Sequence, residues 1–323
     1  MVTALDVMTR RDALRVLGAV PVAGAVAAAS LQGQAPAGKP DVGLVSRHVQ
    51  WTGLEDAIDL AAQIGFDSIE WNVREGGHIE PSRVERELPH AVELTRKAGL
   101  AVTMITTSIQ DAKSPHAEAI LQTMSGLGIR YYRGGQYFRY DYAADVWQQL
   151  QALKPRMAGL AALNEKYKTT VAYHTHSGGG TIGGNIWDFW EVIRDLDPRT
   201  VGLNYDIGHA TARGGNGWID AAHVVADRIS ALAIKDFLWV RSPKGGWRAE
   251  WCPLGEGMID LHRLFTLLKG HGFTGPINIH YEHNDLLGTD VGKWKLSMTR
   301  DRFIEIVAKD LRYVRDQWHA TSV

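Results

Sequence analysis

From residue 41 onward, short runs of β-branched, aromatic and other apolar residues alternate with longer segments whose apolar residues recur every three or four positions. The runs that predict strands cover residues 42–51, 66–73, 101–109, 129–137, 169–176, 201–209, 229–237 and 276–283. The segments that predict helices cover residues 54–65, 82–99, 116–128, 145–167, 186–196, 218–228, 259–272 and 301–318. Four of these helical segments end in glycine, which a helix C-terminus favours: Gly65, Gly99, Gly128 and Gly272.

This strict alternation favours parallel strands joined by right-handed crossovers, because each helix must return the chain to the start of the next strand. Eight such units are what a closed barrel requires. The sequence therefore predicts an α/β protein, a (β/α)8 TIM barrel folded as a single domain over residues 41–318. An open, doubly wound sheet is the alternative. It is disfavoured because no G-x-G-x-x-G follows the first strand, where such a sheet would most often carry one.

Residues 1–40 differ in character from the rest of the chain. Arg10 and Arg11 precede a modestly apolar Ala/Gly/Val run, and Ala-Pro-Ala at 35–37 offers a cleavage site of small residues. This order predicts a twin-arginine-type signal peptide and linker, and hence a periplasmic or secreted protein. A short amphipathic helix is the alternative. A stable membrane anchor is disfavoured because the run is short and contains Pro21 and Gly24.

The overall charge limits the partners that we expect. The 323 residues include 35 Lys and Arg against 36 Asp and Glu, so the formal net charge is −1. A chain without a net basic charge favours neither nucleic acid nor an anionic membrane surface, and we expect no nucleic acid partner. The single cysteine, Cys252, excludes an intramolecular disulfide framework. A homo-oligomer is left open.

Polar residues gather at positions that a barrel brings together. Side chains alternate along a strand, so residues two apart share a face, and active sites in this architecture lie at the carboxyl ends of the strands. The residues that share a face there are Glu70 with Asn72, His174 with His176, Asn204 with Asp206, Ala233 with Lys235, and Asn278 with His280 and Glu282. An apolar interior would not hold so many polar groups without a metal, a ligand or mutual pairing.

Several of these segments resemble the xylose-isomerase-like TIM-barrel superfamily of sugar isomerases and epimerases, over most of residues 41–318. The segment VGLNYDIGHA at 201–210 is similar to that family's sixth-strand motif, and the resemblance implies that Asp206 binds a divalent metal. IKD at 234–236 and PLGEG at 253–257 are similar but less specific. AYHTHSGG at 172–179 and IHYEHND at 279–285 look closer to the inosose dehydratase branch.

The chain also departs from the family's pattern. Two glutamates that bind the metal and exchange a substrate proton in the family's epimerases are replaced here by His174 and His280, and Ala233 stands where a metal-binding histidine is expected. The remaining set is His174, Asp206 and His280, completed by Glu282 or His176. Imidazole and carboxylate ligands suit Mn, Co, Fe, Zn or Mg better than Ca, and the sequence does not identify which ion binds.

The other candidates have both a functional and a plainer interpretation. Lys235, Glu70, Glu282 and His209 are the candidate catalytic residues, and Arg133, His176 and Asn72 are the candidate substrate-binding residues. Lys235 could instead form a structural ion pair with Asp206 or Glu282, His209 could only support Asp206, and Glu70 could bind substrate hydroxyls rather than act as a base. His176 could be a turn residue, and Arg133 could hold an anionic or polyhydroxylated substrate or simply belong to a surface loop.

Three functions remain open for such a site. The first is a metal-dependent sugar isomerase or epimerase that acts through an enediolate on a keto-sugar or sugar derivative. The second is a lyase that dehydrates a keto-sugar or keto-cyclitol, and the third is a noncatalytic sugar-binding barrel. The expected partner in each case is a small carbohydrate or cyclitol. A nuclease related to the AP endonucleases is disfavoured because the chain lacks a basic DNA-binding signal.

Overall fold

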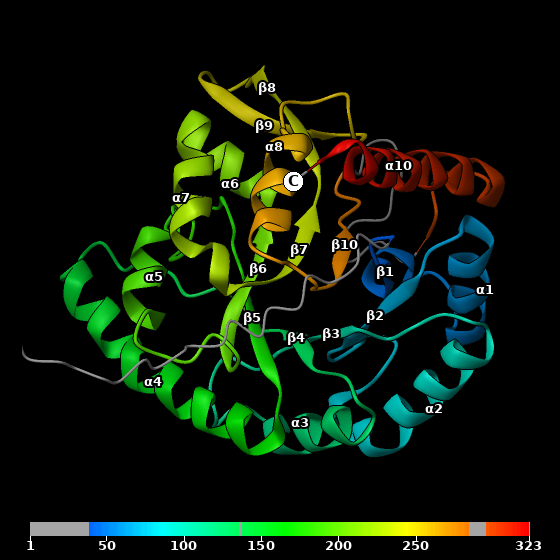
Figure 1. Ribbon diagram of the computed structural model, residues 1–323, viewed down its shortest axis with the longest axis horizontal. Coiled ribbons are helices and arrows are strands. Elements are labelled where there is room, and N and C mark those ends of the chain that lie inside the picture. The colour runs from blue at the N-terminus through cyan, green and yellow to red at the C-terminus, as the bar shows by residue number, and fades with distance from the viewer. Residues whose placement is uncertain (1–38, 136, 284–294, 323) are drawn as a thin grey trace, which may run out of the picture. The chain divides into compact units, whose positions relative to one another are not determined.

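The computed structural model describes residues 39–135, 137–283 and 295–322. Eight parallel strands form a closed barrel in the order β1-β10-β7-β6-β5-β4-β3-β2, as Figure 1 shows. They are β1 (Val42–Val45), β2 (Ser68–Val73), β3 (Met104–Thr107), β4 (Tyr131–Arg133), β5 (Thr170–His174), β6 (Val201–Asp206), β7 (Ile229–Ile234) and β10 (Ile277–Ile279). Each lies within a segment predicted as a strand. The predicted single-domain (β/α)8 barrel is therefore confirmed.

The helices lie around the outside of the barrel (Figure 1). They are α1 (Leu54–Ile64), α2 (Val84–Lys97), α3 (Ala117–Gly126), α4 (Val146–Tyr167), α5 (Trp187–Ile193), α6 (Ile207–Gly214), α7 (Trp218–Val225), α8 (Leu261–Gly270) and α10 (Arg300–Ala320). Short 3-10 helices cover η1 (Ser46–Val49), η2 (Pro81–Arg83), η3 (Gly215–Gly217) and η4 (Ala226–Arg228). The four predicted capping glycines, Gly65, Gly99, Gly128 and Gly272, all have positive φ, which their lack of a side chain permits.

The barrel interior is small and apolar at its centre. Met104, Ala172 and Ala231 form a separate buried cluster there, while the main core fills the space between the strands and the helices. At Gly43, a Cβ atom would lie 2.3 Å from Oδ1 of Asn278 and 2.8 Å from Oγ of Ser68. Only glycine therefore fits on β1 at this point, and the close approach of β10 and β2 closes the barrel.

A β-hairpin after β7 and the helix α6 were not predicted from the sequence. The strands β8 (Asp236–Arg241) and β9 (Trp247–Cys252) form an antiparallel hairpin that leaves the barrel directly after Lys235. The predicted strand at 229–237 is thus two strands, because the chain turns out of the barrel at its end. The helix α6 begins immediately after β6, with the carboxylate of Asp206 accepting a hydrogen bond from the backbone N–H of His209.

The predicted signal peptide falls almost wholly outside the described residues, so export stays a prediction. Among the helices of the described segments, none is long and apolar enough to cross a membrane.

Candidate metal and substrate site

The predicted site residues lie around the carboxyl-terminal end of the barrel. Glu70 and Asn72 lie on β2, Arg133 ends β4, and His174 ends β5. Asp206 ends β6, while Lys235 and His280 directly follow β7 and β10. All seven are at most 6% exposed. The alternation of side chains along the strands therefore brings the predicted polar residues into one buried region.

His174, Asp206 and His280 could together hold a metal ion. One ligand atom from each lies within 4.8 Å of the other two. Nε2 of His174 lies 3.4 Å from Oδ2 of Asp206. Nε2 of both histidines and Oδ2 of Asp206 are buried without a hydrogen-bond partner among the described residues. Two buried ring nitrogens without partners are costly unless something binds to them. Oδ2 of Asp206 lies beside them, although it also pairs with the Lys235 ammonium at 3.1 Å. Two nitrogens with one carboxylate oxygen suit a divalent transition metal.

Neighbouring groups orient two of these ligands. The backbone N–H of Asp206 donates to Oγ1 of Thr175 at 2.9 Å, and Oδ1 of Asp206 accepts from the N–H of His209 at 2.9 Å. These bonds leave Oδ2 as the oxygen available to an ion. Asp206 therefore caps a helix with one carboxylate oxygen and presents the other to the candidate metal position.

Asn204 lies behind His174, with its Nδ2 3.0 Å from Nδ1 of the imidazole. A metal bound at Nε2 requires the proton of the neutral ring to lie on Nδ1, which then needs an acceptor. Oδ1 of Asn204 is buried and has no partner among the residues that the structure describes. Rotation of the amide by half a turn supplies that acceptor, so Asn204 is suited to fix the tautomer of His174. The sequence analysis placed Asn204 on this face but gave it no role.

Lys235 joins three side chains at the site. Its Nζ lies 3.1 Å from Oδ2 of Asp206, 2.7 Å from Oε1 of Glu282 and 2.6 Å from Nε2 of His209. The ion pairs that were the plainer interpretation of Lys235 are present with both acids. Because an ammonium only donates, Nε2 of His209 accepts, and its Nδ1–H is directed to Oγ of Ser177 at 2.8 Å.

Burial and neighbouring charges set the protonation of these groups. Burial lowers the pKa of His174 and of His209 well below the ordinary value, and lowers that of His280 to about 4. All three rings are therefore neutral at pH 7, the form in which imidazole binds metals. Burial raises the pKa of Asp206 despite the charge of Lys235.

Lys235 and Glu282 form a charged pair. Burial would lower the pKa of Lys235, but Asp206 and Glu282 raise it above the ordinary value. Burial would likewise raise the pKa of Glu282, but the Lys235 ammonium holds it well below its usual range. Nδ1 of His280 lies 3.9 Å from Oε1 of Glu282. Glu282 thus lies beside the candidate ligands, but its carboxylate is directed to Lys235.

Glu70 is the acid that β2 brings to the mouth, the carboxyl-terminal end of the barrel. Its Oε1 accepts a hydrogen bond from Oγ1 of Thr106, and its buried Oε2 has no partner among the described side chains. Burial raises the pKa of Glu70, against the lowering effects of Thr106 and Arg133. An unpartnered carboxylate oxygen with a raised pKa suits a general base. Asn72, two residues later, has a buried Oδ1 that also lacks a partner within the described segments.

Arg133, Tyr137 and His176 form one side of the mouth. Nη2 of Arg133 donates to the hydroxyl of Tyr137 at 2.8 Å. The ring of Tyr137 lies 4.2 Å from that of His176, measured between centroids, and 5.9 Å from that of His174. Nδ1 of His176 accepts from the N–H of Gly178, as in the turn interpretation, yet the ring also contacts Tyr137. Arg133 is 6% exposed, so it does not belong to a plain surface loop.

Trp251 of β9 covers the site from the hairpin. The Lys235 ammonium lies 4.6 Å from its ring centroid, and the ring of His209 meets it edge-on at 5.0 Å. His48 of η1 approaches the ring of His280 at 5.8 Å between centroids. Trp251 is one of several tryptophans near glycine-rich segments that could close a pocket, whereas Tyr137 and His48 were not predicted to lie at the site. Tyr137 and His48 lie within predicted strand segments, but only the turn of the chain out of each strand brings them to the mouth.

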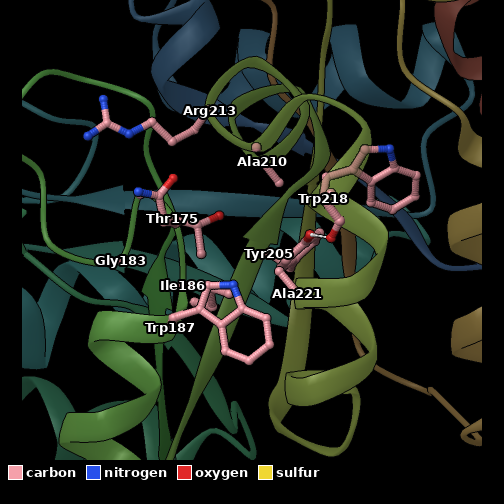
Figure 2. Close-up of a pocket in the computed structure, with 13 residues that line it drawn as sticks. Thr175, Gly183, Ile186, Trp187, Tyr205, Ala210, Arg213, Trp218 and Ala221 are labelled. Atoms are coloured by element: carbon pink, nitrogen blue, oxygen red, sulfur yellow. Dashed lines mark hydrogen bonds between the residues drawn. The ribbon is translucent and has the colours of Figure 1, made fainter.

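A separate cavity of about 370 Å³ lies outside the strands, between β6, α6, α7 and the segment before α5 (Figure 2). Its lining includes Trp187, Arg213 and Trp218. Thr175 also lines it, and Oγ1 of that residue bonds to the backbone of Asp206. None of the predicted site residues lines this cavity. The cavity is therefore distinct from the barrel mouth, where the predicted residues are gathered.

Comparisons with known proteins agree with the fold. A family model described as the xylose isomerase-like TIM barrel matches residues 58–302. An inosose dehydratase from Bacillus licheniformis is 28% identical over 193 residues, which are 54% of this chain. The match spans 60% of the length of that relative.

Two solved structures share the fold at low sequence identity. A crystal structure of the IolI protein with a bound zinc atom is 16% identical, with a TM-score of 0.66, and the match covers 87% of this chain and 100% of that one. The apo form of 3-keto-D-glucoside 4-epimerase from E. coli is 14% identical, with a TM-score of 0.60, covering 86% of this chain and 100% of that one. These likenesses show the barrel fold.

Proposed function

This chain belongs to the xylose isomerase-like TIM barrel family, and from that premise we propose that it is a divalent-metal-dependent isomerase or epimerase of a keto-sugar or sugar derivative. The observation that carries the proposal is the convergence of the unpartnered ring nitrogens of His174 and His280 with the carboxylate of Asp206. Those three residues would hold the ion. When bound, a divalent cation supplies Lewis acidity that stabilises negative charge developing on a substrate oxygen.

Glu70 is the proposed base. Its unpartnered Oε2 takes the proton from the carbon next to the substrate carbonyl, and the electrons of that C–H bond form the double bond of an enediolate. Burial raises the pKa of Glu70, so the carboxylate is basic enough to accept the proton. Return of the proton by Glu70 to the neighbouring carbon, with the hydroxyl proton passing to the former carbonyl oxygen, gives isomerisation. Epimerisation needs a second acid, which delivers a proton to the opposite face of the same carbon while Glu70 keeps the proton it removed.

Lys235 is the proposed electrostatic partner of the developing charge. Asp206 and Glu282 raise its pKa, so it stays an ammonium at neutral pH. A firmly held proton makes Lys235 a poor acid but a lasting positive charge, which suits stabilisation of an oxyanion better than protonation of a leaving group. His209 accepts from the Lys235 ammonium at 2.6 Å, and Glu282 accepts from it at 2.7 Å. These two residues fix its position.

Dehydration of a keto-sugar or keto-cyclitol is the second candidate. The observation that favours it is the 28% identity to the inosose dehydratase of Bacillus licheniformis. It begins with the same removal of a proton, but a hydroxyl group then leaves as water and needs a proton from the protein. The raised pKa of Lys235 weakens that step, which is why we place isomerisation first.

Two measurements on the purified chain test the proposal. Metal analysis by inductively coupled plasma mass spectrometry is expected to find a divalent ion, or activity is expected to depend on an added one. Incubation of the metal-loaded protein with keto-sugars in deuterated water is expected to show deuterium in the sugar without loss of water. Loss of water would identify a lyase instead. If no ion is bound or activating and no deuterium enters the sugar, the result would favour a noncatalytic sugar-binding barrel.

A further inference from the structure

Two arginines at the barrel mouth have no carboxylate partner. Arg133 is 6% exposed, its Nη2 donates to the Tyr137 hydroxyl, and its buried Nε has no hydrogen-bond partner among the described residues. Nε and Nη2 of Arg74 donate to the backbone carbonyls of Thr107 at 2.7 Å and Gly134 at 3.2 Å. Within the described part of the chain, neither guanidinium has a carboxylate oxygen within the 4.0 Å of an ion pair. Both positive charges are therefore left without direct neutralisation.

The two charges are close enough to affect each other and the candidate metal ligands. The pKa of Arg74 lies at about 9, lowered first by burial and then by the charges of Arg133 and Arg47. The charge of Arg133 also lowers the pKa of His174 and His280, although burial is the larger cause in both. The positive field of Arg133 thus reaches the position where an ion would sit.

The candidate ligand set does little to offset this charge. Asp206 is the one carboxylate among the three residues. Of the other two acids of the mouth, Glu282 pairs with Lys235. Glu70 bonds to the neutral Thr106, and its charge offsets only part of that of Arg133 and Arg74. A divalent ion would add further positive charge to a mouth already lined by Arg74 and Arg133. Charge balance in such a buried region calls for an anionic ligand.

We propose that the substrate carries a carboxylate, which Arg133 binds beside the candidate metal position. This inference rests on the proposed function and names its substrate class, an acidic sugar derivative. A carboxylate is planar and accepts two parallel N–H bonds from one edge of a guanidinium. Arg133 offers its unpartnered Nε–H on that edge. The Tyr137 hydroxyl accepts from Arg133, so its own proton is free to donate to the same carboxylate.

Matched small ligands test the inference without knowledge of the natural substrate. D-Gluconate and D-glucitol differ only in a terminal carboxylate against a hydroxymethyl group, and inorganic phosphate provides the other common oxyanion. Isothermal titration calorimetry of each against metal-stripped and metal-loaded protein gives the binding constants. We expect gluconate to bind at least about tenfold more tightly than glucitol in both forms, as for a charge-assisted bond to a buried arginine.

Variants locate the preference on the protein. Arg133→Gln is expected to remove the preference for gluconate over glucitol, and Arg133→Lys to retain a weaker preference, because the charge remains but the planar edge does not. Arg213→Gln is the matched control, since Arg213 lines the outer cavity on α6 (Figure 2) and not the mouth. The control is expected to keep the full preference. If Arg133→Gln does not fold, the reduced preference of Arg133→Lys carries the test.

Several results would overturn the inference. For the natural chain, they are equal binding of gluconate and glucitol, binding of neither, or tighter binding of phosphate than of gluconate. For the variants, they are a preference for gluconate that persists in Arg133→Gln or is lost in Arg213→Gln. The inference would also be overturned if the preference for gluconate over glucitol disappeared in the metal-loaded protein alone. Binding to metal-stripped protein does not depend on the ion. The inference can therefore stand if the metal-dependent function fails, and it can fail while metal binding and proton exchange are retained.

Discussion

The imidazole rings of His174 and His280 lie stacked, with their centroids 5.1 Å apart and their planes 11° apart. Nε2 of each ring is buried without a partner among the described residues, and Oδ2 of Asp206 lies beside them in the same condition. The two rings tolerate this approach because burial keeps both neutral. A site with this geometry would need no rearrangement of these side chains to bind an ion. The contribution of each residue can be tested separately.

The charge of Asp206 is expected to control metal binding. Asp206→Asn keeps an oxygen to cap α6 but removes the negative charge, so the fold should persist while metal affinity falls by at least about a hundredfold. Metal content after dialysis, measured by mass spectrometry, checks this. Asp220→Asn, at an exposed position of α7, is the control. Unchanged metal content in Asp206→Asn would remove this residue from the ligand set.

Asn204 is expected to act through His174. Asn204→Leu removes the only side chain described within hydrogen-bond distance of Nδ1 of His174, so the tautomer that leaves Nε2 free to bind is no longer favoured. Loss of such a supporting group typically weakens metal binding about 10- to 100-fold. Competition with a chelating dye measures the affinity. Asn185→Leu, beside the outer cavity, should leave the affinity unchanged. Equal affinities for both variants would contradict this role.

Substitutions of Lys235 and Glu282 are expected to have non-additive effects on the free energy of unfolding. Lys235→Met leaves the carboxylates of Asp206 and Glu282 without their cation, at a cost of about 3 to 5 kcal/mol in the metal-free protein. The double variant Lys235→Met/Glu282→Gln removes one of the unpaired charges and should recover part of that loss. Urea unfolding of the two single variants and the double variant measures the coupling. Proton exchange should stay low in the double variant, and additive changes in stability would contradict the pairing.

Asp310 is expected to make stability depend on pH. Burial raises its pKa to about 7, and the neighbouring His283, whose pKa burial lowers to about 4, supplies no positive charge at neutral pH. An unfolded Asp titrates near 4, so the folded state holds the proton more tightly, and this stabilisation is lost as pH rises from about 4 to 7.

Asp310→Asn cannot ionise and retains an oxygen for the backbone N–H of Leu254. Its stability relative to the natural chain should therefore rise between pH 4 and pH 8, by up to about 4 kcal/mol. Urea unfolding at pH 5 and pH 8 measures the difference. Asp316→Asn, at an exposed position of α10, should show no such change. A difference independent of pH for Asp310→Asn would disprove the argument.

The barrel could be predicted from the sequence because its determinants are local and repeated. The alternation of strand and helix segments, with glycine at helix ends such as Gly65 and Gly99, predicted every barrel strand. Parity along the strands then grouped His174, Asp206 and His280, since side chains two apart in a strand must share a face. The structure brings these residues together, and their binding of a metal stays a prediction.

The elements that the sequence did not predict are those whose position depends on where the chain leaves a barrel strand. Nothing local to Lys235 and Asp236 indicates that the chain turns there into a hairpin, because the apolar pattern continues through both strands. The carboxylate of Asp236 holds the turn by accepting from the N–H groups of Gly257 and Ile259, which lie more than 20 positions away. Trp251 comes to the site because β9 pairs with β8, where Trp251 lies opposite Phe237.

The side chain of Asp206 divides its two oxygens between a helix end and the candidate ion. This geometry couples the helix end to ion occupancy: a filled site would also steady the first turn of α6. The amide proton of His209 should then exchange with solvent more slowly when the ion is present, which makes that amide a local reporter of occupancy.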